Sequence, residues 1–143
     1  MDRQLPDDFD WVTARARCSA ADMYEILRDL AQVNVTKANA IYVKNAPSAD
    51  PDRFGFRDAP DPTLRQFNVW DKWGLERRTV QVQLDGDAIR VHGSVSREFR
   101  ATLTLTDGGN CKFRVGEAEL DPWQLLRRAL EPLFFGDHVS TNT

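Results

Sequence analysis

The chain has 143 residues and a formal net charge of −3 at pH 7, and 41% of its residues are hydrophobic. A chain of this length is expected to form a single domain over residues 1–143 that buries about two thirds of its unfolded surface. It contains no run of the roughly 20 apolar residues that a membrane span needs, and its acidic first residues do not resemble a signal peptide. We therefore expect a cytoplasmic protein with no membrane partner.

The first predicted element is a strand over residues 9–18, where polarity alternates with a period of two. One face would carry Val12, Ala14, Ala16 and Cys18, and the other face Trp11, Thr13, Arg15 and Arg17. Residues 1–8 precede this strand and are expected to be flexible.

A long helix is predicted over residues 20–45, because Ser19 is a good N-cap and Pro47 prevents its continuation. Its apolar stripe follows spacings of three and four and consists of Met23, Ile26, Leu27, Leu30 and Val33. The β-branched residues after Leu30, together with Lys37 at a stripe position, leave open whether residues 20–45 form one helix or two.

Residues 46–63 contain four prolines and more aspartates than arginines, which predicts a long Pro-rich acidic loop. Phe54 and Phe56 lie on either side of Gly55. We expect these two aromatic side chains to attach the loop to the core.

The next part of the chain alternates in polarity throughout and predicts five strands, over residues 64–73, 78–85, 88–97, 99–106 and 111–120. Two tight turns separate the later strands, at residues 85–87 and 107–110. A bulge at Gly116 is expected, because without it Glu117 and Glu119 would face the core.

A second helix is predicted to start at Asp121 and stop at Gly136, with Pro122 in its first turn. Pro132 is expected to kink this helix or to force a short second segment, because proline lacks a backbone donor. Its apolar stripe is Trp123, Leu126, Leu130, Leu133 and Phe134. Residues 137–143 are expected to be flexible.

These elements predict an α+β fold in the order β-α-β-β-β-β-β-α, which is a single two-layer domain. An antiparallel sheet of about six strands would carry the long helix and the C-terminal helix on the same face. The opposite face, here called the outer face of the sheet, would then be free of helices.

The residues needed for several chemistries are missing or badly placed. Cys18 and Cys111 have inward parity and His92 has outward parity, so no Cys–His nucleophile is expected and both thiols should be buried, free and unreactive. His92 and His138 are far apart, which disfavours a metal site. The Gly108-Gly109 pair lies between two strands, so it does not predict a phosphate loop. No cofactor is expected.

Glu117 and Glu119 are the best candidates for a catalytic pair. On one face of a strand they would lie about 7 Å apart, a spacing that can serve acid–base chemistry. The favoured interpretation is that both are solvated and pair with Lys or Arg on the neighbouring strand.

The outer face of the sheet is the most informative predicted surface, because it would bring basic and aromatic side chains together. Its predicted members are Trp11, Arg15, Arg17, Trp70, Lys72, Arg90, His92, Arg100, Lys112 and Arg114. Such a surface is typical of a dimer interface, of ordinary solvated strands or of a nucleic-acid platform. We rank these interpretations in that order, because net acidity disfavours nucleic acid.

The predicted function is therefore a non-enzymatic binding or interaction module that self-associates, as a homodimer, through the outer face, with Trp11 and Trp70 as anchors. The alternative is a carrier or sensor for a small apolar or anionic molecule, with a pocket between sheet and helices. An acid–base enzyme and an RNA-binding sheet rank below both.

Overall fold

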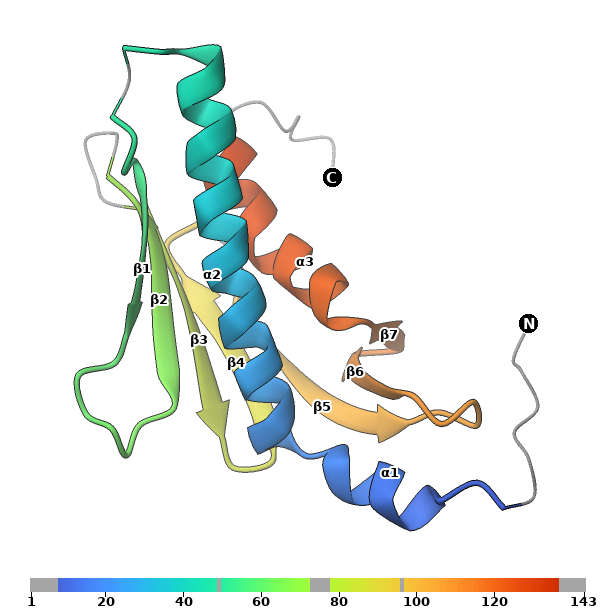
Figure 1. Ribbon diagram of the computed structural model, residues 1–143. Helices are drawn as coiled ribbons and strands as arrows, with labels where there is room; N and C mark the ends of the chain where they lie inside the picture. The colour runs from blue at the N-terminus through green and yellow to red at the C-terminus, as the bar shows by residue number, and fades with distance from the viewer. Residues whose placement is uncertain (1–7, 49, 73–77, 96, 137–143) are drawn as a thin grey trace.

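A computed structural model describes residues 8–48, 50–72, 78–95 and 97–136 (Figure 1). The helices are α1 (Trp11–Arg17), α2 (Ala20–Asn45) and α3 (Pro122–Phe135). The strands are β1 (Phe54–Asp58), β2 (Gln66–Asp71), β3 (Arg78–Asp85), β4 (Ala88–Gly93), β5 (Phe99–Leu105), β6 (Cys111–Val115) and β7 (Ala118–Leu120). The ends predicted to be flexible lie outside the described residues, except for the exposed Asp8.

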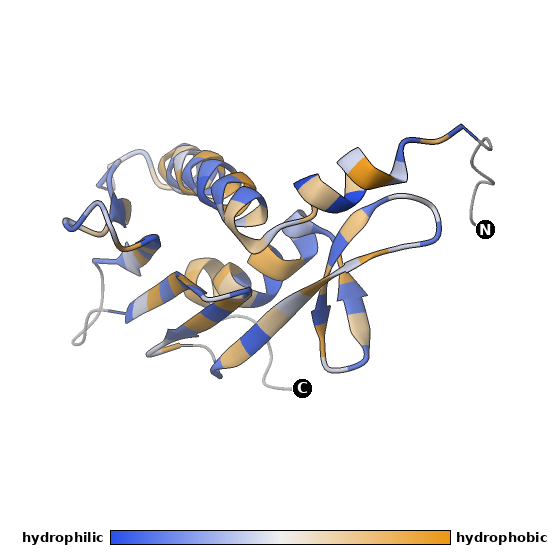
Figure 2. Ribbon diagram, turned by 90° about the horizontal axis from the view of Figure 1, so that it is seen from below, coloured by the Kyte–Doolittle hydropathy of each residue, from blue (hydrophilic) through white to orange (hydrophobic). Residues whose placement is uncertain are grey.

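The fold is α+β, as predicted. Over the described residues, all seven strands form one antiparallel sheet in chain order, β1 to β7, and α2 and α3 lie against the same face of it (Figure 1). Polar and apolar residues alternate along the strands (Figure 2). The order of elements differs from the prediction in two ways. Two helices, α1 and α2, precede the first described strand, and the described residues contain seven strands instead of about six.

The sheet divides at β5. Phe99 and Ala101 pair with β4, whereas Thr102 to Leu105 pair with β6. β5 therefore bridges two parts of the sheet, and it turns away from β4 toward β6 and β7 (Figure 1). We refer to β1–β4 as the first half of the sheet and to β5–β7 as the second half.

The predicted strand over residues 9–18 is wrong, because this segment forms helix α1. Asp10 is its N-cap: the backbone N–H of Thr13 donates to its carboxylate at 3.0 Å, and the Thr13 hydroxyl donates at 2.6 Å. Alanine and arginine favour a helix, and their alternation here does not reflect burial, since no residue of α1 is buried.

The segment over residues 20–45 is one helix, α2, which settles the alternative left open by the sequence. The predicted stripe is correct in part: Met23 and Leu27 are buried and Leu30 packs against the core, whereas Ile26 and Val33 are exposed. The side chains that contact the sheet are Met23, Tyr24, Leu27, Ala31, Val35 and Ala38. Because Ala31 and Ala38 are small, α2 can approach the sheet closely there.

The predicted loop over residues 46–63 contains strand β1, so that prediction was wrong in part. Asn39 of α2 holds this strand by two hydrogen bonds: its amide donates to the Phe54 carbonyl at 2.9 Å, and its side-chain oxygen accepts from the Phe54 N–H at 2.8 Å. Gly55 lies under the ring of Trp70, where a Cβ would come within 2.3 Å of that ring. Glycine is therefore required at this position.

The predicted strand over residues 111–120 is a hairpin rather than one bulged strand. Val115 pairs with Ala118, so Gly116 and Glu117 form a two-residue turn between β6 and β7. Gly116 has a φ of 60°, a conformation that favours glycine. The polarity pattern resembled a bulge because a short hairpin also places two consecutive polar residues in sequence.

The C-terminal helix α3 begins as predicted, with the Asp121 N–H donating to the Gln124 side chain at 2.8 Å. It continues through Pro132 to Phe135. Trp123, predicted in the apolar stripe, is 57% exposed. The buried residues of α3 are Leu125, Leu126, Ala129, Leu130 and Leu133.

A buried ion cluster attaches the end of α3 to the first half of the sheet. Asp71 is fully buried, and its carboxylate accepts from Arg53 at 2.9 and 3.0 Å and from Arg78 at 2.9 Å. Arg78 also donates to the Leu133 carbonyl at 3.0 Å. Two guanidinium groups satisfy the buried carboxylate, and one of them holds α3 in place.

Cys18 and Cys111 form a disulfide bond, with their Cα atoms 5.2 Å apart, so the prediction of two free thiols was wrong. Cys18 is the C-cap of α1 and Cys111 is the first residue of β6. Their sequence separation of 93 is why no local pattern indicated the bond. It ties the junction of α1 and α2 to the second half of the sheet.

Candidate functional site

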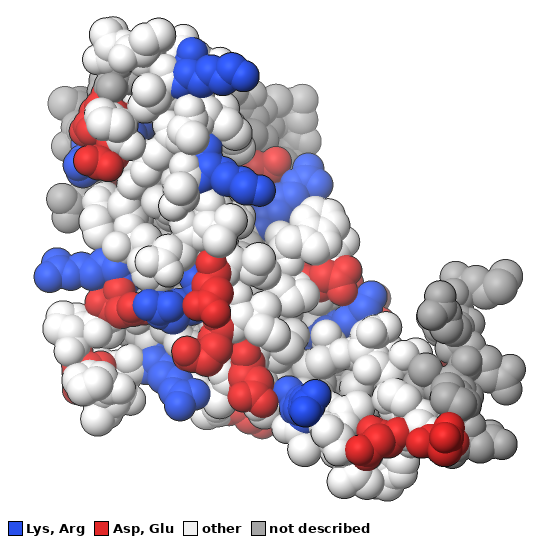
Figure 3. All heavy atoms as spheres, in the orientation of Figure 1, with Lys and Arg blue, Asp and Glu red and all other residues white. Residues whose placement is uncertain are grey.

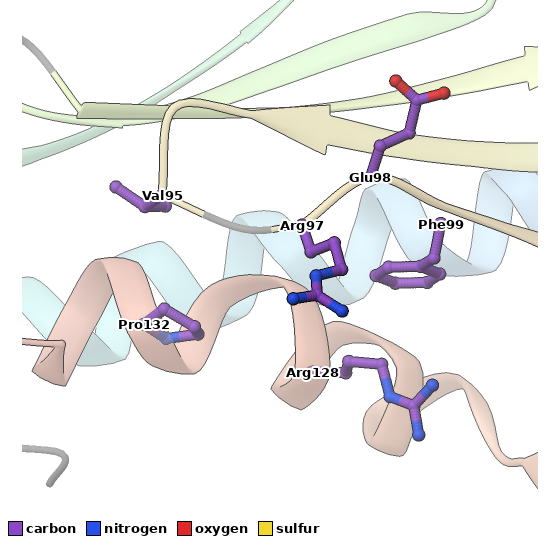
Figure 4. A pocket seen from close by; sticks show the side chains of 6 residues that line it. All are labelled: Val95, Arg97, Glu98, Phe99, Arg128 and Pro132. Carbon is purple, nitrogen blue, oxygen red and sulfur yellow. The ribbon is translucent and has the colours of Figure 1, made fainter. Parts of the chain in front are cut away.

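A hollow of about 310 Å³ opens between α3 and the connection from β4 to β5 (Figure 4). Val95, Phe99 and Pro132 give it apolar walls, and its other lining residues are Arg97, Glu98 and Arg128. It lies where the two halves of the sheet part, beside the end of β5 that pairs with β4. The fold thus leaves space between its two layers at this point.

Two arginines border this hollow on opposite sides. Arg97 precedes β5 and extends toward α3, whereas Arg128 belongs to α3 itself (Figure 4). The Arg128 guanidinium lies over the Phe99 ring, 5.8 Å from its centroid, which is within the range of a cation–π interaction. Among the described residues, neither arginine has an ion-pair partner.

Glu98, the acidic residue of the lining, does not neutralise these arginines. Its carboxylate points away from α3 (Figure 4) and accepts two hydrogen bonds of 3.2 Å from Arg90 on β4. Those hydrogen bonds, and then the charges of Arg90 and His92, hold the pKa of Glu98 below its usual value. The charge left at the hollow is therefore positive.

The described lining provides binding groups and no catalytic pair. It contains no Cys, Ser, Thr, His or Lys, which are the usual nucleophiles and bases. Glu98 is engaged with Arg90. The arrangement can hold an apolar group against Phe99 and Pro132 and can offer two cations to its polar end.

The residues predicted for the outer face are only partly brought together. Trp11, Arg15 and Arg17 lie on α1 and not on the sheet, and Lys72 follows the end of β2. The strand register places the remaining predicted residues on the outer face: Trp70, Arg90, His92, Arg100, Lys112 and Arg114.

The outer-face cations are paired with acids, which sequence parity did not reveal. Distances between charged atoms are 3.2 Å for Arg90–Glu98, 2.7 Å for Arg100–Asp85, 3.3 Å for Arg114–Glu119 and 3.7 Å for Lys112–Asp121. Lys72 similarly lies 3.7 Å from Asp50. A surface whose cations are matched in this way attracts polyanions weakly, because binding would have to displace these carboxylates.

His92 lies between Gln81 of β3 and the start of β5 on the outer face. Its Nε2 atom is buried and has no hydrogen-bond partner within the described part of the chain. His92 belongs to no metal site of this kind, because the described residues contain no group of three or more His, Cys, Asp or Glu side chains that could hold a metal ion.

The candidate pair Glu117 and Glu119 is separated by the structure. Glu117 lies in the β6–β7 turn and is exposed, while Glu119 lies on β7, 3.3 Å from Arg114. They do not share the face of one strand. The interpretation favoured from the sequence for Glu119, a solvated carboxylate paired with an arginine of the adjacent strand, matches its position.

Large exposed apolar side chains lie on the helices. Trp123 and Phe135 border a groove between α2 and α3, and Val33 and Ile41 are exposed on α2. Figure 3 views this side of the molecule, where acidic and basic side chains are interspersed among uncharged ones.

The sequence analysis did not predict the hollow, because its walls come from two segments that are distant in sequence. Arg97 and Phe99 lie about 30 residues before Arg128 and Pro132. The signal that was available is Arg97 two residues before the strand residue Phe99, an aromatic side chain at an inward position. Which positions remain unfilled depends on how the layers meet.

No family model, curated protein or solved structure matches the chain. Among the described residues, no helix has the length and apolar character needed to cross a membrane.

Proposed function

We propose that this protein is a non-enzymatic binding module that holds a small molecule in the hollow between α3 and the β4–β5 connection. The observation that supports this function is an apolar recess beside the packed core, bordered by two arginines that have no ion-pair partner among the described residues. Sites for small molecules are usually concave, mostly apolar and equipped with a few polar groups. This is the alternative function that the sequence analysis predicted.

The size of the hollow limits its ligand. Its volume of about 310 Å³ is at the lower end of the range of about 300–1,000 Å³ typical of ligand pockets. A molecule with one medium-length alkyl chain or one aromatic ring system fits such a space, whereas a folded partner does not enter it.

A neutral fluorescent probe, N-phenyl-1-naphthylamine, tests this proposal, because its emission rises in apolar surroundings. We expect the wild-type protein to bind the probe and Phe99→Ala to bind it at least about fivefold more weakly, because the variant loses the aromatic wall. Trp123→Ala is the matched control, because it removes an exposed aromatic side chain of α3 at the other groove.

Circular dichroism should confirm that both variants are folded. Equal binding by wild type and Phe99→Ala, or loss of binding in Trp123→Ala alone, would show that the probe does not occupy the hollow. Either result would refute the proposed function.

Self-association through the outer face is a second proposal, supported by one observation. The strand register places Trp70 on the outer face, its ring over Gly55, and the helices α2 and α3 lie against the opposite face (Figure 1). Trp11, the other predicted anchor, lies on α1 and is 64% exposed. The proposed homodimer therefore rests on Trp70.

The location of the protein is a further proposal. Disulfides persist in oxidising compartments and are rare in the cytosol, so the Cys18–Cys111 bond weighs against the cytoplasmic location that the sequence predicted. We propose that the chain acts in an oxidising environment. Alkylation of free thiols in freshly lysed cells tests this, since a largely alkylated native protein would support the cytoplasm instead.

A further inference from the structure

We infer that the ligand of the hollow is an anionic amphiphile, whose apolar body lies against Phe99 and whose single oxyanion group binds Arg97 and Arg128. This inference rests on the proposed function and adds the chemical class of the ligand. It excludes neutral and cationic molecules as the preferred occupants.

The two guanidinium groups border the same hollow. Arg97 extends from the sheet side and Arg128 from α3, and both belong to the lining of the same hollow (Figure 4). Both residues are exposed enough for an incoming group to reach their N–H donors. A guanidinium presents its donors as a planar fork, which matches the two oxygens of a carboxylate or two oxygens of a phosphate.

The nearest acidic neighbours of these arginines in sequence are already engaged by other arginines. Glu98, next to Arg97, pairs with Arg90 at 3.2 Å. Glu131, on the same helix as Arg128, lies 3.3 Å from Arg127. Arg97 and Arg128 therefore keep their charge uncompensated within the described chain, in contrast to the cations of the outer face.

The contact between Arg128 and Phe99 explains why the ligand should also be apolar. The guanidinium carbon lies 5.8 Å from the ring centroid, so the arginine borders the aromatic wall directly. A ligand that places its oxyanion on Arg128 brings the atoms next to that group onto Phe99, and then toward Val95 and Pro132. An inorganic anion would leave these apolar walls uncovered.

Titration calorimetry with four ligands that share an eight-carbon chain tests the inference: octanoate, octyl phosphate, 1-octanol and octylamine. We expect octanoate or octyl phosphate to bind at least about tenfold more tightly than 1-octanol, and octylamine to bind most weakly. The comparison of the two anions identifies the head group that the arginines prefer. The affinity of the better anion should fall as salt is added.

Variants that remove one charge show which arginines account for the preference for anions. Arg97→Gln and Arg128→Gln should each weaken binding of the better anion about fivefold and leave 1-octanol binding nearly unchanged. Arg100→Gln is the matched control, because it removes the same charge from β5 on the outer face, outside this lining, and leaves the Arg127–Glu131 pair intact. It should bind the anion as wild type does.

The outcomes separate this inference from the proposed function. If 1-octanol binds as tightly as both anions, or if Arg100→Gln weakens binding of the anion as much as Arg97→Gln and Arg128→Gln, the inference is wrong while the hollow remains a binding site. If none of the four ligands binds, the inference is wrong as well. If the neutral naphthylamine probe also fails to bind, the proposed function fails with it.

Discussion

The two halves of the sheet are held in different ways. In the first half, aromatic rings fill the space under α2: Phe67 lies 5.8 Å from Tyr24 and 5.3 Å from Phe56 between ring centroids. The second half contributes fewer fully buried side chains, among them Phe113, and a disulfide joins it to the start of α2. Apolar packing dominates one half, and a covalent bond supports the other.

This difference accounts for the position of the hollow. α3 contacts strands of both halves, β2 and β3 on one side and β6 and β7 on the other. Where the sheet turns at β5, the helix cannot follow both halves closely, and the space beside Phe99 stays unfilled. The change in direction of the sheet therefore creates the recess at β5, and the core around Phe67 stays fully packed.

The largest expected effect comes from the filled half. Phe67→Ala removes a fully buried ring and should lower the free energy of unfolding by about 3–5 kcal/mol. Phe99→Ala should cost clearly less, because Phe99 is only partly buried at the border of an existing hollow. Urea denaturation of both variants measures the difference. Equal losses would mean that the recess is as tightly packed as the core.

The next effect concerns the covalent support of the second half. Replacing both cysteines by serine should lower the free energy of unfolding by about 2–4 kcal/mol, because the bond closes a long loop in the unfolded chain. Trypsin should also cleave faster after Arg15 and Arg17, since α1 buries no residue of its own. The wild-type protein with and without reductant is the control. No change on reduction would show that packing alone holds this half.

A smaller effect is a dependence of stability on alkaline pH, which arises from Tyr24, a residue of α2 that packs on Phe67 in the first half of the sheet. Burial, and then the charges of Asp58 and Glu25, raise the pKa of Tyr24 above its ordinary value of 10. The unfolded chain then loses this proton before the folded chain does, so stability should fall as pH rises above 10, by on the order of 1 kcal/mol per pH unit. Chemical denaturation at several alkaline pH values measures this. Tyr24→Phe should reduce the slope, and an unchanged slope would contradict the assignment.

The smallest expected change in stability is on the outer face. Trp70→Glu should cost about 1 kcal/mol or less, because Trp70 contributes to no part of the core around Phe67. If the chain self-associates through this face, the variant should sediment as a smaller particle than the wild type. An unchanged mass would remove the support for the homodimer, and an unfolded variant would show that Trp70 is needed for the sheet itself.

The sequence predicted the parts of the fold that depend on local chemistry. Alternating polarity and the turn at Asp85–Asp87 located the hairpin of β3 and β4, and Ser19 marked the start of α2. The errors in the predicted elements occurred where the alternation or spacing of apolar residues does not arise from burial. α1 alternates in polarity although none of its residues is buried, and in α2 the large exposed residue Ile26 was mistaken for a contact with the sheet.

The site could be predicted less well than the fold. Strand parity correctly placed Arg90 and Arg114 on the outer face, but it could not show that Glu98 and Glu119 neutralise them. That requires knowing which strands are adjacent and in which register. The same limit hid the disulfide, because Cys18 and Cys111 meet only after the second half of the sheet has turned toward α1.

The disulfide also changes what a cut in the chain can do. Residues 19–110, which include α2 and β1–β5, form a closed covalent ring when Cys18 and Cys111 are joined. A single cleavage of the backbone inside this ring releases no fragment, since both new ends stay attached through the sulfur atoms. The nicked protein would keep its mass, apart from one added water molecule, and would separate into two pieces only after reduction.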